Sequence, residues 1–331
     1  MRKVARKACY PFIAILGAHV IAGQVFQCMV RAHFMMVSRT SILLIHLFAL
    51  SASAQIVSYD GFEEYAFNAQ FESGANGSSG VGLNGGLGWN GAYDVNNAIK
   101  TLVKDEDRTA APVAYTNGDI AIDGGTHAMR LYDVANGSAT FVRPLSETFS
   151  ASDTLFFSFL FRTTAASPLA NQDFFQLGFD TGTVTNPRLS IGANTTATAF
   201  PPSQPFRFFA RSTTATTAAS NAFDNTTDIA ATTTYFLVGK LTGSGSTFDH
   251  IDLFVNPSTS AEPASSASLT LNSGVTNIDT LILRTAFLDN GDAYVFDELR
   301  IARDWQSVIP EPNAAALLLL GATLVTRRRK K

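Results

Sequence analysis

The feature that most constrains the fold is a set of short runs in which every second residue is apolar. In the strongest run, residues 155–162, this repeat places apolar side chains on both faces. The two alternating sets are Leu155, Phe157, Phe159 and Phe161, and Phe156, Ser158, Leu160 and Arg162. Period two is the repeat of a β-strand, and a strand that is apolar on both faces is covered on both sides. The run therefore predicts a central strand of a sheet.

Four more runs alternate in the same way, and loop-forming residues separate them. The runs are 206–211, 235–241, 251–255 and 281–287. Clusters of Gly, Asn, Thr, Ser and Pro, as in 242–247 and 256–261, have the composition of turns. Residues 55–308 contain no convincing amphipathic helix. The pattern predicts an all-β sandwich of the jelly-roll kind in one domain, 55–308, which is long enough for a single large core.

The C-terminal segment, residues 309–331, has a different composition. It consists of Pro310-Glu311-Pro312, an apolar run from Ala314 to Val325, and the basic residues Arg327, Arg328, Arg329, Lys330 and Lys331. As a short hydrophobic helix the apolar run would rise about 18 Å, against a hydrocarbon core of roughly 30 Å. The basic cluster should stay on the cytoplasmic side. These properties predict transient insertion into the inner membrane better than a permanent span.

The order of these three parts resembles the PEP-CTERM sorting signal. The resemblance implies export by a Gram-negative bacterium and processing by an exosortase-type membrane peptidase. It implies that Pro310, Glu311 and Pro312, together with Arg327, Arg328 and Arg329, form the signal, and that the protein ends at the cell surface or outside the cell. The alternative is an ordinary tail anchor in which Pro-Glu-Pro has no role.

The N-terminal segment, residues 1–54, has the composition of a targeting sequence. It contains six cations, no Asp or Glu, and two apolar runs. From Met35 or Met36, Arg39 supplies the positive region, 42–50 the apolar region, and Ala52-Ser53-Ala54 a cleavage site before Gln55. Residues 1–34 are either an upstream start that is not used or an extended leader. We expect the secreted chain to begin at Gln55.

Removing both ends leaves an acidic body without cysteine. Of the 24 cations, six lie in residues 1–54 and five in residues 327–331, which leaves 13 against 27 acidic residues and a formal charge of −14. This charge disfavours nucleic acid as a partner, because phosphate binding needs clustered Lys and Arg. Cys9 and Cys28 both lie in the leader, so the body has no disulfide and no cysteine metal site.

The two ends of the body carry a second resemblance. Residues 59–63, Tyr-Asp-Gly-Phe-Glu, open the body, and residues 294–301, Tyr-Val-Phe-Asp-Glu-Leu-Arg-Ile, close it. With the glycine-rich segment around Trp89, they are similar to a concanavalin-like, laminin-G-like domain of exported bacterial proteins. The resemblance implies that the first and last strands pair, and that the concave sheet or its rim loops hold polysaccharide.

No catalytic constellation stands out. Gly80, Gly82 and Gly85 have dinucleotide-site spacing, but they open no helix and fit a glycine loop better. His127 and His250 are the only histidines after the leader, too few for a triad or a multi-histidine metal site. The Glu-x-Asp-x-x-Glu strand of laminarinase-like glycosidases is absent. We therefore expect no catalytic residues and a protein that is not an enzyme.

Two sets of residues are candidates for ligand binding. Trp89, Tyr93 and Trp305 offer either a platform for sugar rings or ordinary core packing. Residues 289–292, Asp-Asn-Gly-Asp, read as a hairpin turn, and Asp289 and Asp292 also have the oxygen chemistry that Ca²⁺ prefers. Beyond this candidate calcium site we expect no cofactor.

Three functions remain open from the sequence. The first is an exported surface or extracellular-matrix protein, non-enzymatic, that binds polysaccharide. The second is a glycan-active hydrolase or lyase on the same scaffold. The third is a purely structural component of the cell envelope. Two carboxylates that converge in a cleft would favour the second.

Overall fold

The computed structural model of the chain describes residues 55–65, 70–71, 83–96, 101–104, 113–132, 137–164, 173–182, 186–194, 206–214, 219–288 and 292–310. These residues belong to one compact unit, Ala54–Lys331. The predicted leader, 1–54, and the sorting signal from Glu311 onward lie outside the described residues. Within the described ranges, no helix is long and apolar enough to cross a membrane.

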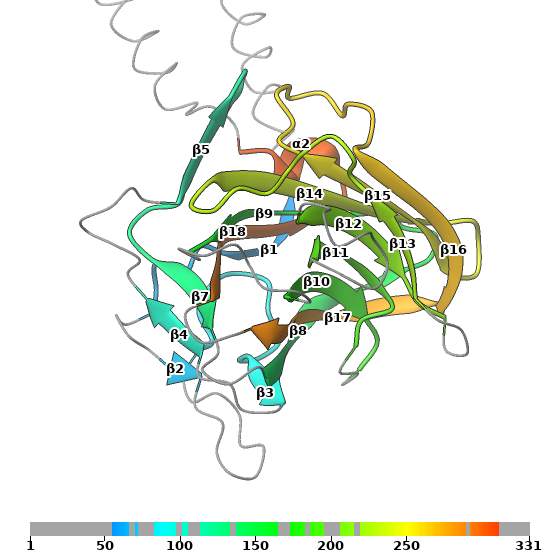
Figure 1. Cartoon of the computed structure of the whole chain (residues 1–331). Coiled ribbons are helices and arrows are strands. Elements are labelled where there is room, and N and C mark those ends of the chain that lie inside the picture. The colour runs from blue at the N-terminus through cyan, green and yellow to red at the C-terminus, as the bar shows by residue number, and fades with distance from the viewer. Residues whose placement is uncertain are drawn as a thin grey trace, which may run out of the picture. The chain divides into compact units, whose positions relative to one another are not determined.

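The larger of the two main sheets is antiparallel, and among the described residues it has nine strands (Figure 1). In spatial order they are β16 (Ala267–Val275), β15 (Phe248–Val255), β14 (Thr234–Gly243), β9 (Leu155–Thr163), β18 (Ala293–Ala302), β7 (Ala128–Tyr132), β4 (Thr101–Lys104) and β2 (Gln70–Phe71), with β1 (Ile56–Asp60) paired to β18. All nine residues of β9 are buried, and the strand lies between β14 and β18. The prediction that residues 155–162 form a central strand is confirmed.

The second sheet is also antiparallel and has seven described strands. Their order is β13 (Ser220–Phe223), β12 (Arg207–Ser212), β11 (Leu189–Asn194), β10 (Phe174–Asp180), β17 (Asn277–Leu288), β8 (Gly137–Ser150) and β3 (Asp94–Asn96). We call the face of this sheet that points away from the other sheet its outer face.

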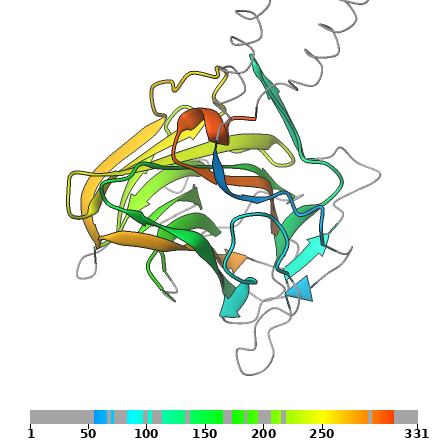
Figure 2. The ribbon, with the colours of Figure 1, turned by 180° about the vertical axis from the view of Figure 1, so that it is seen from behind.

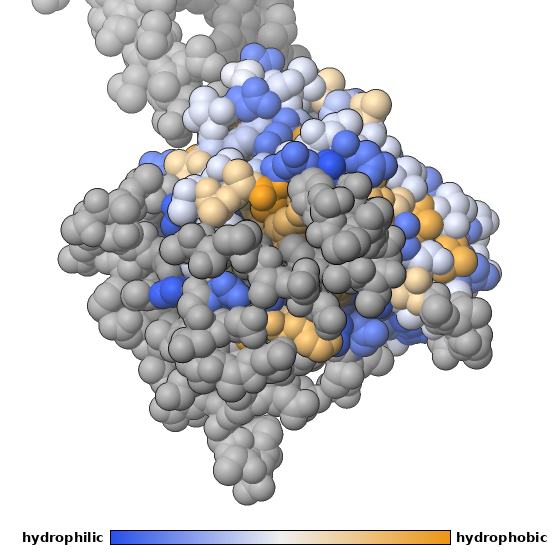
Figure 3. Space-filling view, in the orientation of Figure 1, coloured by the Kyte–Doolittle hydropathy of each residue, from blue (hydrophilic) through white to orange (hydrophobic). Residues whose placement is uncertain are grey.

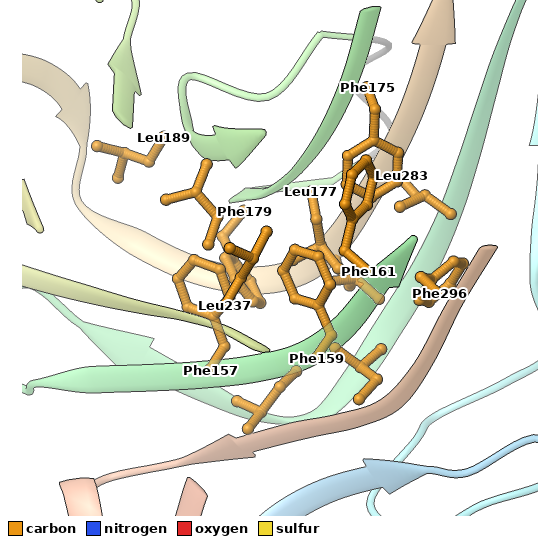
Figure 4. Packing of buried hydrophobic residues seen from close by; sticks show 14 of the residues in the cluster. Phe157, Phe159, Phe161, Phe175, Leu177, Phe179, Leu189, Leu237, Leu283 and Phe296 are labelled. Carbon is orange, nitrogen blue, oxygen red and sulfur yellow. The ribbon is translucent and has the colours of Figure 1, made fainter. Parts of the chain in front are cut away.

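The main core lies between the two sheets and is rich in phenylalanine (Figure 4). The ring centroids of Phe157 on β9 and Phe179 on β10 are 4.8 Å apart, and those of Phe161 and Phe175 are 5.0 Å apart. Edge-to-face and tilted contacts of this kind stabilise beyond the burial of area alone. The alternation seen in the sequence therefore places one set of each strand's residues in this core.

A further layer covers the other side of the nine-stranded sheet. It is formed by the short helix α2 (Trp305–Val308) and by the hairpin of β5 (Ala114–Asn117) and β6 (Ile120–Asp123). Asp304 caps α2 by accepting a hydrogen bond from the Ser307 backbone N–H at 2.9 Å. Figure 2 shows α2 beside β1 on this side of the sheet. Phe156 and Phe254 pack edge-on against Trp305 in this layer.

The described residues confirm the all-β class and correct one detail. β1 pairs with β18, as the second resemblance implies. The described part of the body contains one short helix of four residues, α2, which forms where Asp304 supplies an N-cap. The hairpin predicted at residues 289–292 is wrong: β17 pairs with β8 and β10, whereas β18 pairs with β1, β7 and β9 in the other sheet. The chain crosses between sheets there.

Candidate functional site

The outer face of the seven-stranded sheet is polar and aromatic in a way that the core face is not. Along β10, Phe175, Leu177 and Phe179 enter the core, so the alternate residues Phe174 and Gln176 point outward. The register places these outward residues of neighbouring strands side by side: Phe174, Gln176, Ser190, Asn194, Arg207, Phe209, Arg211, Thr280, Ile282 and Arg284. Figure 3 shows hydrophilic and hydrophobic surface side by side on the described part of the molecule.

Two arginines, Arg211 on β12 and Arg284 on β17, lean toward the same ring on this face. Their guanidinium carbons lie 5.5 Å and 5.4 Å from the centroid of Phe174, which itself stacks on Phe209 with an interplanar angle of 20°. Burial lowers the pKa of both guanidinium groups, and the charge of Arg284 lowers that of Arg211 further. The two cations therefore sit close together and partly out of water.

Neither of these arginines has a carboxylate partner among the described residues. Two nearby arginines differ: Arg188, just before β11, is paired with the buried Asp180, and Arg207 on β12 pairs with Asp228 at 2.9 Å. Within the described residues, the buried Nε of Arg211 has no hydrogen-bond partner. Charged groups in proteins are normally paired when they lose water, and the described residues supply no anion for Arg211 and Arg284.

Asn194 supplies an unsatisfied acceptor beside the same ring. It lies directly opposite Phe174 on β11, is 6% exposed, and its Oδ1 has no hydrogen-bond donor in the described structure. The neighbouring Gln176 is satisfied, because its Nε2 donates to Asn186 Oδ1 at 3.0 Å and its Oε1 accepts from Ser190 Oγ at 3.3 Å. Of these two amide side chains, only that of Asn194 has an oxygen without a donor in the described structure.

A pocket of about 550 Å³ opens on the same sheet, over β3, β8 and β17. Most of its polar lining consists of carboxylate, amide and hydroxyl groups: Asn90, Asp94, Ser146, Thr148, Asp279 and Thr280. Asp94 is exposed, while Asp279 is partly buried and accepts from the Gly182 backbone N–H at 3.0 Å and Thr280 Oγ1 at 2.7 Å. Such groups are suited to hydrogen-bonding sugar hydroxyls, and two carboxylates in one pocket are suited to proton transfer.

Of the two roles left open for Trp89, Tyr93 and Trp305, the structure shows core packing for Tyr93 and Trp305. Tyr93 is 1% and Trp305 5% exposed, and they belong to different hydrophobic clusters on the two sides of the nine-stranded sheet. Trp89 is partly buried, and its ring lies 4.3 Å from the guanidinium carbon of Arg143. The reason is that these rings bury more area in packing than they would on a loop.

Trp89 and Tyr93 instead help to hold a buried ion pair. Arg143 stacks on both rings and donates to Asp60 Oδ2 at 2.5 Å, with side-chain exposures of 0% and 1%. Asp60 also accepts from the Phe62 backbone N–H and from Tyr65 Oη, at 3.0 and 2.8 Å. This Asp60–Arg143 cluster joins the end of β1 to β8, so its role is structural.

The calcium prediction remains untested. Asp289 lies outside the described residues, and Asp292 is 8% exposed. Among the described residues there is no group of three or more His, Cys, Asp or Glu that could hold a metal ion. Gln55 and Pro310 fall within the described ranges, but the predicted cleavage residues Ala52 and Ala54 and the rest of the sorting signal do not.

The remaining titratable candidates sit apart from the pocket. His250 lies 3.1 Å from Asp252 Oδ2, and His127 lies 3.2 Å from Glu63 Oε2. Asp297 is fully buried, and its Oδ2 has no partner in the described structure. Burial and the nearby Glu298 raise its pKa well above the usual range. None of these residues lines the pocket.

Sequence reasoning missed Arg211, Arg284, Asn194, Asp94 and Asp279. The alternation in 206–211 and 281–287 did place the two arginines opposite the apolar residues of their strands. The alternation does not give the order of strands in the sheet. β12 and β17 are far apart in the chain, and in the sheet β11 and β10 lie between them.

No protein-family model and no curated protein matches the sequence. Solved structures do resemble the described fold. One is an endo-β-1,4-glucuronan lyase from the fungus Trichoderma reesei, with a TM-score of 0.39 and 12% identity over 63% of this chain and 93% of that one. Another is the alginate lyase Aly36B, with a TM-score of 0.38 and 12% identity over 61% and 96%. The globular domain of T. cruzi calreticulin has a TM-score of 0.38 and 10% identity over 58% and 78%.

These comparisons correct the expectation that the protein is not an enzyme. Two of the three structures just named are lyases. The low count of histidines, on which that expectation rested, excludes only chemistries that need histidine.

Proposed function

We propose that this protein is a glycan-active enzyme, a hydrolase or lyase, whose polysaccharide substrate lies across the outer face of the seven-stranded sheet. The observation that carries the proposal is the contrast between the two sheets. The nine-stranded sheet is covered by α2 and the β5–β6 hairpin, whereas the outer face of the other sheet carries hydrogen-bonding side chains and a pocket of about 550 Å³. Clefts with convergent polar groups are the usual sites of small-molecule chemistry.

The pocket offers two carboxylates for the chemistry, Asp94 and Asp279. In hydrolysis one carboxylic acid protonates the leaving glycosidic oxygen while the other carboxylate takes a proton from water, which adds to the anomeric carbon. In elimination a base removes the proton next to a sugar carboxylate, and the C–O bond to the leaving sugar breaks to form a C=C bond. Both reactions need one base and one acid at the scissile bond.

The test uses the full-length chain and a panel of neutral, uronic-acid and sulfated polysaccharides. Binding is measured by affinity electrophoresis, and cleavage by new reducing ends and by the ultraviolet absorbance of unsaturated ends, which only elimination produces. We expect cleavage of at least one polymer, and a loss of about a hundredfold or more in rate for Asp94→Asn or Asp279→Asn.

The matched control is Glu147→Gln, an exposed carboxylate that pairs with Arg303 and does not line the pocket. It should keep the wild-type cleavage rate, and the melting temperatures of all three variants should stay near that of the wild type. The proposal fails if no polymer of the panel is cleaved, or if both pocket variants cleave at the wild-type rate.

We propose, in addition, that the chain is exported and that exosortase-type processing removes the tail. The support is the sequence: a signal-peptide pattern before Gln55, and Pro310-Glu311-Pro312 followed by an apolar run and arginines. The described strands begin at Ile56 and end at Ala302, between these two segments. Intact mass spectrometry of the protein from its host should show both ends removed; an intact C-terminus would exclude processing.

A further inference from the structure

The starting observation is that Arg211 and Arg284 form a pair of like charges without a counter-ion among the described residues. Both are partly buried, and both lie against Phe174. Like charges that share a partly desolvated site repel each other, so an anion bound beside them would relieve this repulsion. Arg188, just before β11, and Arg207, on β12, do have carboxylate partners, in contrast to Arg211 and Arg284.

The sheet register explains why the two cations converge. Arg284 lies opposite Gln176, and Gly192 and Phe209 follow in the same row across the sheet. Arg211 belongs to the next row, opposite Ser190. Glycine contributes no side chain to this face at Gly192, and the long arginine side chains lean over the row toward Phe174. Both guanidinium carbons thus lie within about 5.5 Å of the centroid of the same ring.

Asn194 provides a second, independent observation at this place. Its side chain is more than nine-tenths buried, and its Oδ1 lacks a donor in the described structure, although it lies directly beside Phe174. An orphan acceptor requires a donor such as a hydroxyl group, whereas the arginines require an anion. A ligand that carries an acidic group next to a hydroxyl would satisfy both needs.

We propose that Arg211, Arg284 and Asn194 form a subsite that binds an acidic sugar unit, with the arginines on its anionic group and Asn194 on a neighbouring hydroxyl. This inference rests on the proposed function and names the substrate class: an anionic polysaccharide, bearing either carboxylate or sulfate. Guanidinium pairs with both groups through parallel hydrogen bonds. Arg284 lies four residues from Thr280 on β17 and on the same face, about 13 Å from the pocket lining, so one polymer can occupy both places.

Because the body as a whole is acidic, binding of an anionic polymer must depend on the two arginines of the subsite. Residues 55–326 carry a formal charge of −14, so an anionic polymer is repelled by the protein as a whole. Binding must then depend on the local pair rather than on net charge. Loss of one guanidinium should therefore have a large effect on affinity.

The experiment compares three oligosaccharide sets with the full-length chain by isothermal titration calorimetry at physiological ionic strength. They are a uronic-acid oligomer, the same oligomer made neutral by reduction of its carboxyl groups, and a sulfated oligomer that has no carboxyl groups. We expect the uronic-acid or the sulfated oligomer to bind at least tenfold more tightly than the neutral one. Arg211→Gln and Arg284→Gln should each weaken that binding by about tenfold to a hundredfold and leave neutral binding unchanged.

The matched control is Arg303→Gln, an arginine paired with Glu147 and Asp153 away from this face, which should not change affinity. Thermal melting separates binding from a structural role, because removing one of two unpaired like charges should leave the melting temperature equal or higher. Equal binding of acidic and neutral oligomers, unchanged in both variants, would overturn this inference and leave the proposed function standing. No binding of any of the three sets would overturn both.

Discussion

Removal of the Asp60 carboxylate is the sharpest test of the fold's energetics. In Asp60→Ala the Arg143 guanidinium stays in a site where its side chain is 0% exposed, and it loses its one carboxylate partner. The Phe62 backbone N–H and the Tyr65 hydroxyl lose their acceptor as well. Breaking a buried pair on one side costs about 3–5 kcal/mol, because the remaining charge keeps only neutral acceptors, here the backbone oxygens of Gly85 and Gly91. We expect a loss of this size in the free energy of unfolding.

Urea denaturation and scanning calorimetry measure this loss directly. For a domain of this size each kcal/mol corresponds to roughly 2–4 °C, so the melting temperature should fall by about 6–20 °C. The control is Glu147→Ala, which breaks a pair with Arg303 in which both side chains are more than 40% exposed, and which should cost under about 1 kcal/mol.

A double variant completes the cycle. Asp60→Leu combined with Arg143→Met replaces both charges by apolar groups, so it should be more stable than either single variant. If Asp60→Ala costs no more than Glu147→Ala, or if the effects of Asp60→Leu and Arg143→Met simply add, the reasoning about a desolvated charge at this place is wrong.

Three further predictions concern other parts of the fold. Because burial raises the pKa of Asp297 above its unfolded value, the stability it contributes is present below about pH 4 and is lost as the pH rises through the folded pKa. Asp297→Asn should therefore lose less stability than the wild type between about pH 4 and pH 8 in calorimetry; equal pH slopes would contradict this. Gly88→Ala should lower the free energy of unfolding, measured by urea denaturation, by about 1–3 kcal/mol more than Gly182→Ala. Both glycines have left-handed φ values, +76° and +64°. Of the two, only Gly88 lies where a Cβ would collide with a backbone oxygen, that of Val57. Trp305→Ala should cost about 3–5 kcal/mol by the same measurement, since it empties the contact between α2 and the nine-stranded sheet; a loss under about 1 kcal/mol would show that this layer is dispensable.

The strands themselves were predictable because their signal is local. Residues 155–162 became β9, and 206–211, 235–241, 251–255 and 281–287 became parts of β12, β14, β15 and β17. Alternation along a strand is a property of consecutive residues, and burial on one or both faces follows from it. The all-β class needed no tertiary information.

Strand pairing and the candidate site depended on contacts between distant segments. Asn290-Gly291 has the local chemistry of a hairpin, yet β17 and β18 enter different sheets, where their strand partners come from distant parts of the sequence. The rings of Trp89 and Tyr93 likewise pack against the guanidinium group of Arg143, which is distant in the sequence.

The sequence by itself therefore determined that the body is a β-rich, acidic chain with apolar residues on alternate positions, since these are properties of neighbouring residues and of composition. Only the tertiary structure decided that Arg211, Arg284 and Asn194 meet over Phe174, and that Asp94 and Asp279 share a pocket. The physical reason is that a site on the face of a sheet is assembled across strands, and the order of strands is set by the packing of the whole core.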